Sequence, residues 1–193
     1  MYLFLQGPQR IGKSTILRNA LLPHESAVAG LLVQRLVENG RICGFRACSV
    51  RGELPALEGA YAADLEGVFL YHGKAFPAVL EHAVSRAEAL CAEESSKLII
   101  LDEIGGLELS SLAFMQPLEA IMALGKPCLG VIKSRENLTH TIARLGLPST
   151  ILCQNEMLHR RIAEGGKVLS VNESNLVQTA QAVADFVASV QGA

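Results

Sequence analysis

The chain has no tryptophan, and aromatic residues make up only 5% of its 193 positions. It also lacks an apolar run of 18 residues, so we expect no membrane-spanning helix. Acidic and basic residues nearly balance at 19 against 17, and a net charge of −2 gives no general basic field. We therefore expect neither nucleic acid nor a membrane as a partner. The hydrophobic content of 50% is that of an ordinary α/β protein, and the length suits one domain over residues 1–193.

Cysteine and histidine occur without the spacings that metal sites need. The five cysteines are odd in number and include no C-x-x-C pair, so reduced thiols are expected rather than a disulfide framework or a metal site. The five histidines include no H-x-x-x-H pair, and none is assigned to a metal. The cysteines are Cys43, Cys48, Cys91, Cys128 and Cys153.

The pattern near the N-terminus is the most informative one in the chain. Residues 7–14 read GPQRIGKS and fit the P-loop (Walker A) pattern G-x-x-x-x-G-K-[ST]. A short apolar run at 2–5 precedes it, and a helical segment at 14–22 follows, which is the strand–loop–helix setting of this motif. The alternative is a glycine-rich turn with an incidental lysine. The residues predicted to bind phosphate are Gly7, Pro8, Gln9, Arg10, Ile11, Gly12, Lys13, Ser14 and Thr15.

The residue types in this loop suit a polyphosphate with its metal ion. Gly7 and Gly12 permit backbone angles at which successive N–H groups face phosphate oxygens, and a helix N-terminus adds partial positive charge. Lys13 supplies a catalytic cation for the β- and γ-phosphates, and the Ser14 hydroxyl is a suitable ligand for Mg²⁺. Because the loop begins at Gly7, little chain precedes it for a signal peptide, and we expect a cytoplasmic protein.

The hydrophobic pattern predicts an α/β fold with a mostly parallel central sheet and helices on both faces. Asn39-Gly40 is a type I′ turn signal and adds a β-hairpin, while residues 51–71 read as loop with short extended pieces. The predicted strands are 2–5, 27–37, 41–50, 97–103, 127–133, 150–153 and 168–171. The predicted helices are 14–22, 76–94, 110–124, 138–145 and 173–190.

Two carboxylates follow a buried mid-chain strand. Residues 98–101 are all apolar and lead into Asp102 and Glu103, which is typical of a Walker B strand. We expect this strand to end next to the strand that carries the P-loop, where Asp102 would hold Mg²⁺. Glu103 would accept a proton from the attacking water or orient it. The alternative is that Glu103 is an exposed acid or part of a structural ion pair.

Phosphoryl transfer also calls for further cations around the developing charge. Lys133 and Arg135 follow the strand after the carboxylates, and Arg10 lies inside the loop, so these three are candidates by position. Arg160 and Arg161 fall on a later helix. Solvated surface charge is the alternative for each of them.

These motifs resemble those of the small P-loop nucleoside triphosphatases known as the thermophilic or cancer-related nucleoside-triphosphatase family. The resemblance covers most of the chain: the loop at 7–15, the glycine-containing hairpin at 29–45, the segment LDEIGGLEL at 101–109 and residues 168–175. It implies a RecA-like or nucleotide-kinase-like sheet. It also implies Mg²⁺-dependent hydrolysis of ATP, GTP and other nucleoside triphosphates to diphosphate.

The chain departs from the family pattern at several accessory positions. Arg10 stands where glycine is frequent, Val37 where an arginine is frequent, and Gly106 where a lysine is common. Lys133-Ser134 replaces a His-Arg pair. The phosphate-binding residues are intact, so these departures concern rate and substrate rather than binding.

Two other functions share the same core residues. A small-molecule or nucleotide kinase would need an acceptor pocket and a lid that excludes water. A nucleotide-dependent switch or assembly factor would signal through a conformational change, although the guanine-specific N-K-x-D sequence is absent.

Overall fold

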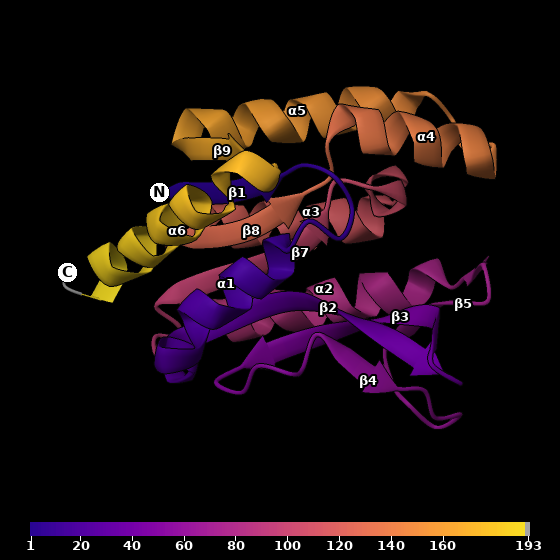
Figure 1. Cartoon of the computed structure of the whole chain (residues 1–193), viewed down its shortest axis with the longest axis horizontal. Helices are drawn as coiled ribbons and strands as arrows, with labels where there is room; N and C mark the ends of the chain where they lie inside the picture. The colour runs from indigo at the N-terminus through magenta and orange to yellow at the C-terminus, as the bar shows by residue number, and fades with distance from the viewer. Residues whose placement is uncertain (192–193) are drawn as a thin grey trace.

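The computed structural model describes residues 1–191, in which nine strands form one sheet flanked by helices (Figure 1). The strand order is β6-β5-β3-β2-β7-β8-β1-β9, and β4 pairs with β2 outside this path. The parallel strands are β1 (Tyr2–Gln6), β2 (Val28–Glu38), β7 (Leu98–Ile104), β8 (Cys128–Ile132) and β9 (Gly166–Ser170). They follow one another in the order β2-β7-β8-β1-β9, so the prediction of a mostly parallel α/β sheet is confirmed.

An antiparallel extension begins at β2. The strand β3 (Arg41–Arg51) pairs with β2 through a tight turn in which Asn39 has φ 51° and Gly40 φ 72°. Both residues adopt the positive φ that a type I′ turn requires, and the predicted hairpin is confirmed. The extension continues through β5 (Val68–Tyr71) and β6 (Lys74–Ala75), while β4 (Glu58–Ala60) runs parallel to the outer half of β2.

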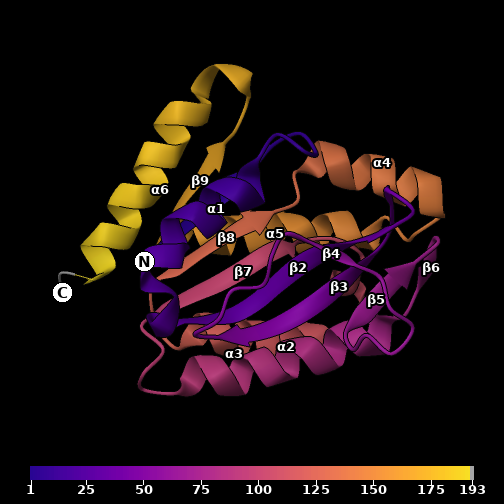
Figure 2. The same ribbon diagram turned by 60° about the horizontal axis from the view of Figure 1, so that its bottom comes forward.

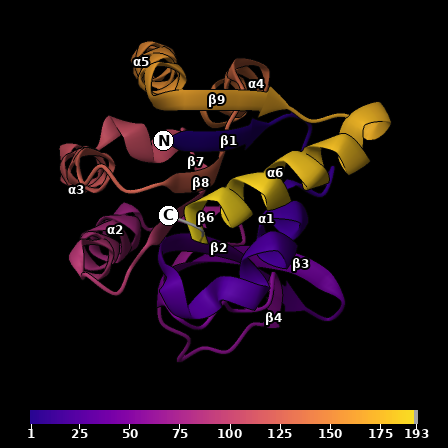
Figure 3. The ribbon, with the colours of Figure 1, turned by 90° about the vertical axis from the view of Figure 1, so that its left-hand side faces the viewer.

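The helices cover both faces of the sheet because each carries an apolar stripe. The helices are α1 (Lys13–Leu21), α2 (Pro77–Ala92), α3 (Leu112–Ala123), α4 (Arg135–Leu145), α5 (Thr150–Gly165) and α6 (Leu176–Gln191). Seen along the sheet, α2, α3 and α5 lie on one face, and α1 and α6 lie on the other (Figure 3). In α2, for example, Leu80, Val84, Ala87 and Cys91 are buried at steps of three or four residues.

One predicted strand is wrong. Residues 150–153 form the first turn of α5 rather than a strand. The buried positions Ile151, Asn155, Leu158 and Ile162 are four, three and four residues apart, which is a helical repeat. The apolar pair Ile151-Leu152 is too short to distinguish a strand from a helix. Asn155 also interrupts the apolar stripe by which the first turns of the helix could have been predicted.

The carboxyl ends of the parallel strands, the tip of the β2–β3 hairpin and α4 lie toward one end of the molecule, whereas the chain ends lie at the other (Figure 2). Within the described part of the chain, short 3₁₀ turns connect the elements at Leu22–Ala27, Leu107–Ser110 and Glu173–Asn175. Among residues 1–191, no helix is both long and apolar enough to span a membrane. All five cysteines are free thiols.

Candidate nucleotide-binding and catalytic site

The loop from Gly7 to Gly12 leaves the carboxyl end of β1 and leads directly into α1. Gly12 occupies the N-cap position with φ 99°, and none of the side chains in the described chain caps this helix. The first-turn N–H groups of α1 are therefore available to an anion, as in phosphate-binding helices. Gly7 has φ 141°, and a Cβ there would lie 2.4 Å from the carbonyl oxygen of Val171 after β9. The loop thus needs glycine at Gly7 for packing and at Gly12 for its backbone angle.

Lys13 folds back over this loop. Its Nζ donates to the carbonyl oxygens of Gly7 at 3.0 Å and Pro8 at 2.7 Å, and the residue is only 7% exposed. Burial lowers the pKa of Lys13, while the charges of Glu103 and Asp102 raise it and that of Arg35 lowers it further. The charges of both predicted carboxylates therefore favour the protonated form of Lys13.

Asp102 is the buried member of that pair. It is 1% exposed, and its Oδ1 accepts a hydrogen bond of 3.1 Å from the Ser14 hydroxyl. Its Oδ2 is buried and has no hydrogen-bond partner within residues 1–191. Burial and the nearby charge of Glu103 raise the pKa of Asp102 to about 7, and the Ser14 hydrogen bond opposes this rise.

These oxygens fit a magnesium ion. An unpartnered carboxylate oxygen beside a serine hydroxyl is a hard-oxygen donor set, and a cation would remove the cost of burying the charge. The described residues contain no group of three His, Cys, Asp or Glu side chains able to hold a metal by themselves. Mg²⁺ does not require such a group, because it keeps several waters and shares its remaining ligands with substrate phosphates.

A bulge in β7 turns the two carboxylates in different directions. Leu101 pairs with Gly130 of β8, but the next pair joins Ile104 to Ile132, so β7 contains one extra residue there. Glu103 has φ 57°, an uncommon value for a non-glycine residue, and its side chain is exposed. Bulges and strained residues of this kind occur beside active sites, where they re-aim side chains. Asp102 consequently faces Ser14 while Glu103 faces outward.

The expectation that the two site-bearing strands are neighbours is wrong. β8 lies between β1 and β7 in the sheet. The two halves of the site still meet, because Ser14 in the first turn of α1 reaches Asp102 across the end of β8. The spacing of motifs along a chain does not encode the order of strands, so the sequence could not reveal this arrangement.

The predicted accessory cations either contact an acidic side chain or are exposed. Arg135 forms an ion pair with Glu156 of α5, and Arg10 is exposed with φ 63°. Lys133 extends toward Gly106, where an added Cβ would lie 3.3 Å from its Nζ and 2.9 Å from Oε2 of Glu108. The absence of a side chain at Gly106 therefore makes room for the Lys133 ammonium beside Glu108. Two further arginines predicted on a helix lie on α5, Arg160 and Arg161, and Arg161 donates to the carbonyl of Glu119.

Two site residues were not predicted. Asn137 in α4 donates from Nδ2 to the carbonyl oxygen of Gly7 at 3.0 Å, which ties α4 to the P-loop. Arg35 in β2 lies beyond the last β2–β7 pair, Leu31 with Leu101, and its charge acts on Lys13. Its Nη1 is paired with Glu58 of β4 at 2.8 Å. Neither residue belongs to a motif, and only the folded topology brings them to the loop.

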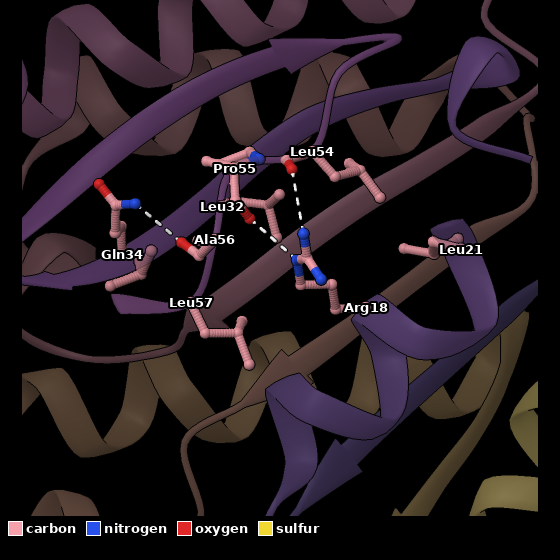
Figure 4. Close-up of a pocket in the computed structure, with 9 residues that line it drawn as sticks. Arg18, Leu21, Leu32, Gln34, Leu54, Pro55, Ala56 and Leu57 are labelled. Carbon is pink, nitrogen blue, oxygen red and sulfur yellow. Dashed lines mark hydrogen bonds between the residues drawn. The ribbon is translucent and has the colours of Figure 1, made fainter. Parts of the chain in front are cut away.

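The segment before β4 is tied down beside the P-loop helix (Figure 4). Arg18 of α1 donates from Nε to the carbonyl of Pro55 at 3.0 Å, and Gln34 of β2 donates to that of Ala56 at 2.8 Å. A small, mainly apolar pocket remains between these elements, lined by side chains that include Leu21 and Leu32. These bonds hold the chain that leads to Glu58, and therefore the ion pair of Arg35.

Comparison with known proteins identifies the family. The family model described as NTPase matches residues 2–175. The nucleoside-triphosphatase THEP1 of Pyrococcus abyssi is 26% identical over 189 residues, covering 90% of this chain and 97% of that protein. THEP1 of Saccharolobus solfataricus is 29% identical over 137 residues, covering 67% and 74%.

Two solved structures share the fold. The solution structure of a human cancer-related nucleoside triphosphatase has a TM-score of 0.63 and 21% identity, covering 100% of this chain and 98% of that one. The crystal structure of THEP1 from Aquifex aeolicus has a TM-score of 0.62 and 18% identity, covering 97% and 99%. These likenesses confirm the P-loop α/β fold, and the family match over most of the sequence confirms the predicted resemblance. The chain belongs to the NTPase family.

Proposed function

We propose that this protein hydrolyses nucleoside 5′-triphosphates, ATP and GTP among them, to diphosphate and phosphate with Mg²⁺ as cofactor. The observation that carries the proposal is that the Ser14 hydroxyl, in the uncapped first turn of the P-loop helix, lies 3.1 Å from Asp102, beside a buried lysine that folds over the loop. The names of the relatives support the same activity.

In the proposed reaction the P-loop binds the triphosphate tail. The N–H groups at the start of α1 donate to phosphate oxygens, and Lys13 exchanges its bonds to the loop carbonyls for bonds to the β- and γ-phosphates. Ser14 and Asp102 would hold Mg²⁺. Bound there, the ion would offset negative charge on the β- and γ-phosphate oxygens.

Glu103 acts on the attacking water. Its exposed carboxylate accepts one proton as the water oxygen forms a bond to the γ-phosphorus, and the bond from that phosphorus to the β–γ bridging oxygen breaks. The nucleoside diphosphate leaves with the bridging oxygen, and the γ-phosphate leaves as inorganic phosphate. The β7 bulge sets the direction in which the Glu103 side chain leaves the strand, away from that of Asp102.

We assign to Arg35 the stabilisation of the charge that develops on the γ-phosphate. It lies in β2 beyond the last pair that this strand makes with β7, and its charge lowers the pKa of Lys13. The ion pair with Glu58 restrains the guanidinium without burying it. A preorganised cation at this position would lower the barrier without contributing much to ground-state binding.

The test is a panel of nucleoside triphosphates with Mg²⁺, in which free phosphate and any phosphorylated acceptor are measured together. Glu103→Gln should bind nucleotide normally and hydrolyse it at least about 100-fold more slowly, because general-base catalysis contributes roughly 10² to 10⁴. Lys13→Ala should lose tight triphosphate binding. Glu119→Gln, which alters an exposed acid on α3, is the matched control. Normal turnover in Glu103→Gln would refute the mechanism, and a phosphorylated acceptor with little free phosphate would indicate a kinase.

A further inference from the structure

A polar side chain is buried where the helix α5 faces the sheet. Asn155 is 0% exposed and shares its face of α5 with Ile151, Leu158 and Ile162, which are all buried and apolar. A buried amide costs free energy unless it is hydrogen bonded, so an apolar residue would be expected at this position. Asn155 therefore needs an explanation beyond packing.

The amide of Asn155 joins two chain segments that belong to different halves of the site. Its Nδ2 donates to the carbonyl oxygen of Gly105 at 2.9 Å and to that of Lys133 at 3.1 Å. Gly105 lies two residues after Glu103, and Lys133 directly follows β8. One side chain thus links the end of the carboxylate strand to the end of the strand between it and the P-loop.

The backbone around Asn155 is adapted to this contact. Gly105 has φ 92°, and a Cβ there would lie 2.9 Å from Nδ2 of Asn155 and 3.0 Å from Ile132. The N–H of Lys133 donates to the carbonyl of Ile104 at 2.8 Å, and His159 of α5 also approaches the Lys133 carbonyl at 3.1 Å. Glycine at this point lets the amide approach the strand ends closely.

The linkage continues to the P-loop. Lys133 is followed by Ser134, which caps α4 by accepting from the N–H of Asn137. Asn137 then donates to the carbonyl oxygen of Gly7. A connected path of hydrogen bonds and short backbone segments therefore runs from Glu103 through Asn155 to the loop that would hold the phosphates.

We propose that Asn155 is a positioning residue, whose amide fixes the distance between the Glu103 bulge and the P-loop by clamping Gly105 and Lys133. The role rests on the proposed hydrolysis, and Asn155 itself touches no substrate. Its Oδ1 is buried with no partner among the described residues, so the amide is retained at a cost in stability. The two hydrogen bonds from Nδ2 explain why an amide is present at this position, where an apolar side chain would avoid that cost.

Two variants remove the clamp in different ways. Asn155→Leu restores an apolar stripe of similar volume, and Asn155→Ala removes the amide without adding bulk if leucine prevents folding. Leu158→Ala is the control, because it opens a cavity on the same face of α5 and alters none of the bonds to Gly105 or Lys133. We measure turnover and nucleotide affinity, together with amide hydrogen exchange of peptides that cover residues 103–106 and 133–137 in the nucleotide-free protein.

We expect the Asn155 variants to lose turnover roughly 10- to 100-fold, since small displacements of catalytic groups have effects of this size. Their nucleotide affinity should stay within about threefold, and exchange should rise in both peptides. Leu158→Ala should lower the melting temperature while leaving turnover and these two peptides unchanged. Turnover within twofold of wild type in both Asn155 variants, or unchanged exchange, would overturn the proposal. If the wild-type protein releases no phosphate from any nucleoside triphosphate, the proposed function fails, and the exchange data alone decide whether the clamp exists.

Discussion

The two glycines of the P-loop should fail in different ways when each is replaced by alanine. Gly7 has φ 141°, and its added Cβ would meet the Val171 carbonyl oxygen at 2.4 Å. Gly12 has φ 99°, and a Cβ there meets nothing within 4 Å. Gly7→Ala therefore disturbs the contact between the loop and the chain after β9, whereas Gly12→Ala adds a methyl group only to the open space at the start of α1.

The structure sets the expected magnitudes. A positive φ imposed on alanine costs about 1–2 kcal/mol at either position. The collision at Gly7 is with backbone and adds about 1–3 kcal/mol of overpacking, for a total of about 2–5 kcal/mol. For a chain of this length each kcal/mol lowers the melting temperature by about 2–4 °C. We expect losses of about 5 °C for Gly12→Ala and about 10–15 °C for Gly7→Ala.

The melting temperatures can be measured by far-UV circular dichroism, because the chain has no tryptophan to report unfolding by fluorescence. Binding of a Mg²⁺–nucleotide should be weakened strongly in Gly12→Ala although the protein is folded, since the methyl group takes space expected for phosphate. Gly125→Ala, at a positive φ of 70° with open space around it, reports the backbone cost alone. Equal stability of the two P-loop variants, or normal nucleotide binding by Gly12→Ala, would contradict the reasoning.

Three other predictions follow from single side chains. Arg35→Ala should lower turnover at least about tenfold with little change in nucleotide affinity. The control Arg41→Ala, at the exposed turn, should change neither quantity, and steady-state kinetics with binding titrations measure both. Burial raises the pKa of Glu108 above its ordinary 4.5, so the free energy of unfolding falls as pH rises through the raised value. Glu108→Gln should therefore raise the melting temperature more at about pH 8 than at about pH 5. A thiol reagent should modify Cys153 quickly in the native protein, because it is exposed, while burial raises the pKa of Cys91 to about 12; rapid modification of more than one thiol per chain would contradict this.

Most of the fold could be predicted because local signals and tertiary packing agree. The P-loop, the Asn39-Gly40 turn and the apolar strands at 98–101 and 128–132 each carry a strong local pattern. Helix α5 was misassigned at its start because Asn155 replaces an apolar residue in its buried stripe. The residue that interrupts the buried stripe of this helix is the one that links the helix to the site, so the proposed role and the local pattern conflict at that point.

The residues of the candidate site could be predicted only where they belong to a local sequence motif. The meeting of Ser14 with Asp102 followed from two motifs, and the structure brings them together. Other site residues lie on helices and strands that come near the P-loop only because of the order of the strands in the sheet. These residues are Arg35, Asn137 and Asn155. Side chains recruited in this way carry no motif, because what selects them is their distance from the loop after folding.

The position of β1 in the sheet has a consequence for synthesis on the ribosome. This first strand pairs with β8 and β9, so its partners are residues 128–132 and 166–170. The phosphate loop is made before both of these partners, so its supporting strand remains unpaired on both sides until β8 has emerged. Nucleotide can therefore stabilise the nascent chain only after β8 and β9 have been made, and until then the apolar residues of β1 depend on other means of protection from aggregation.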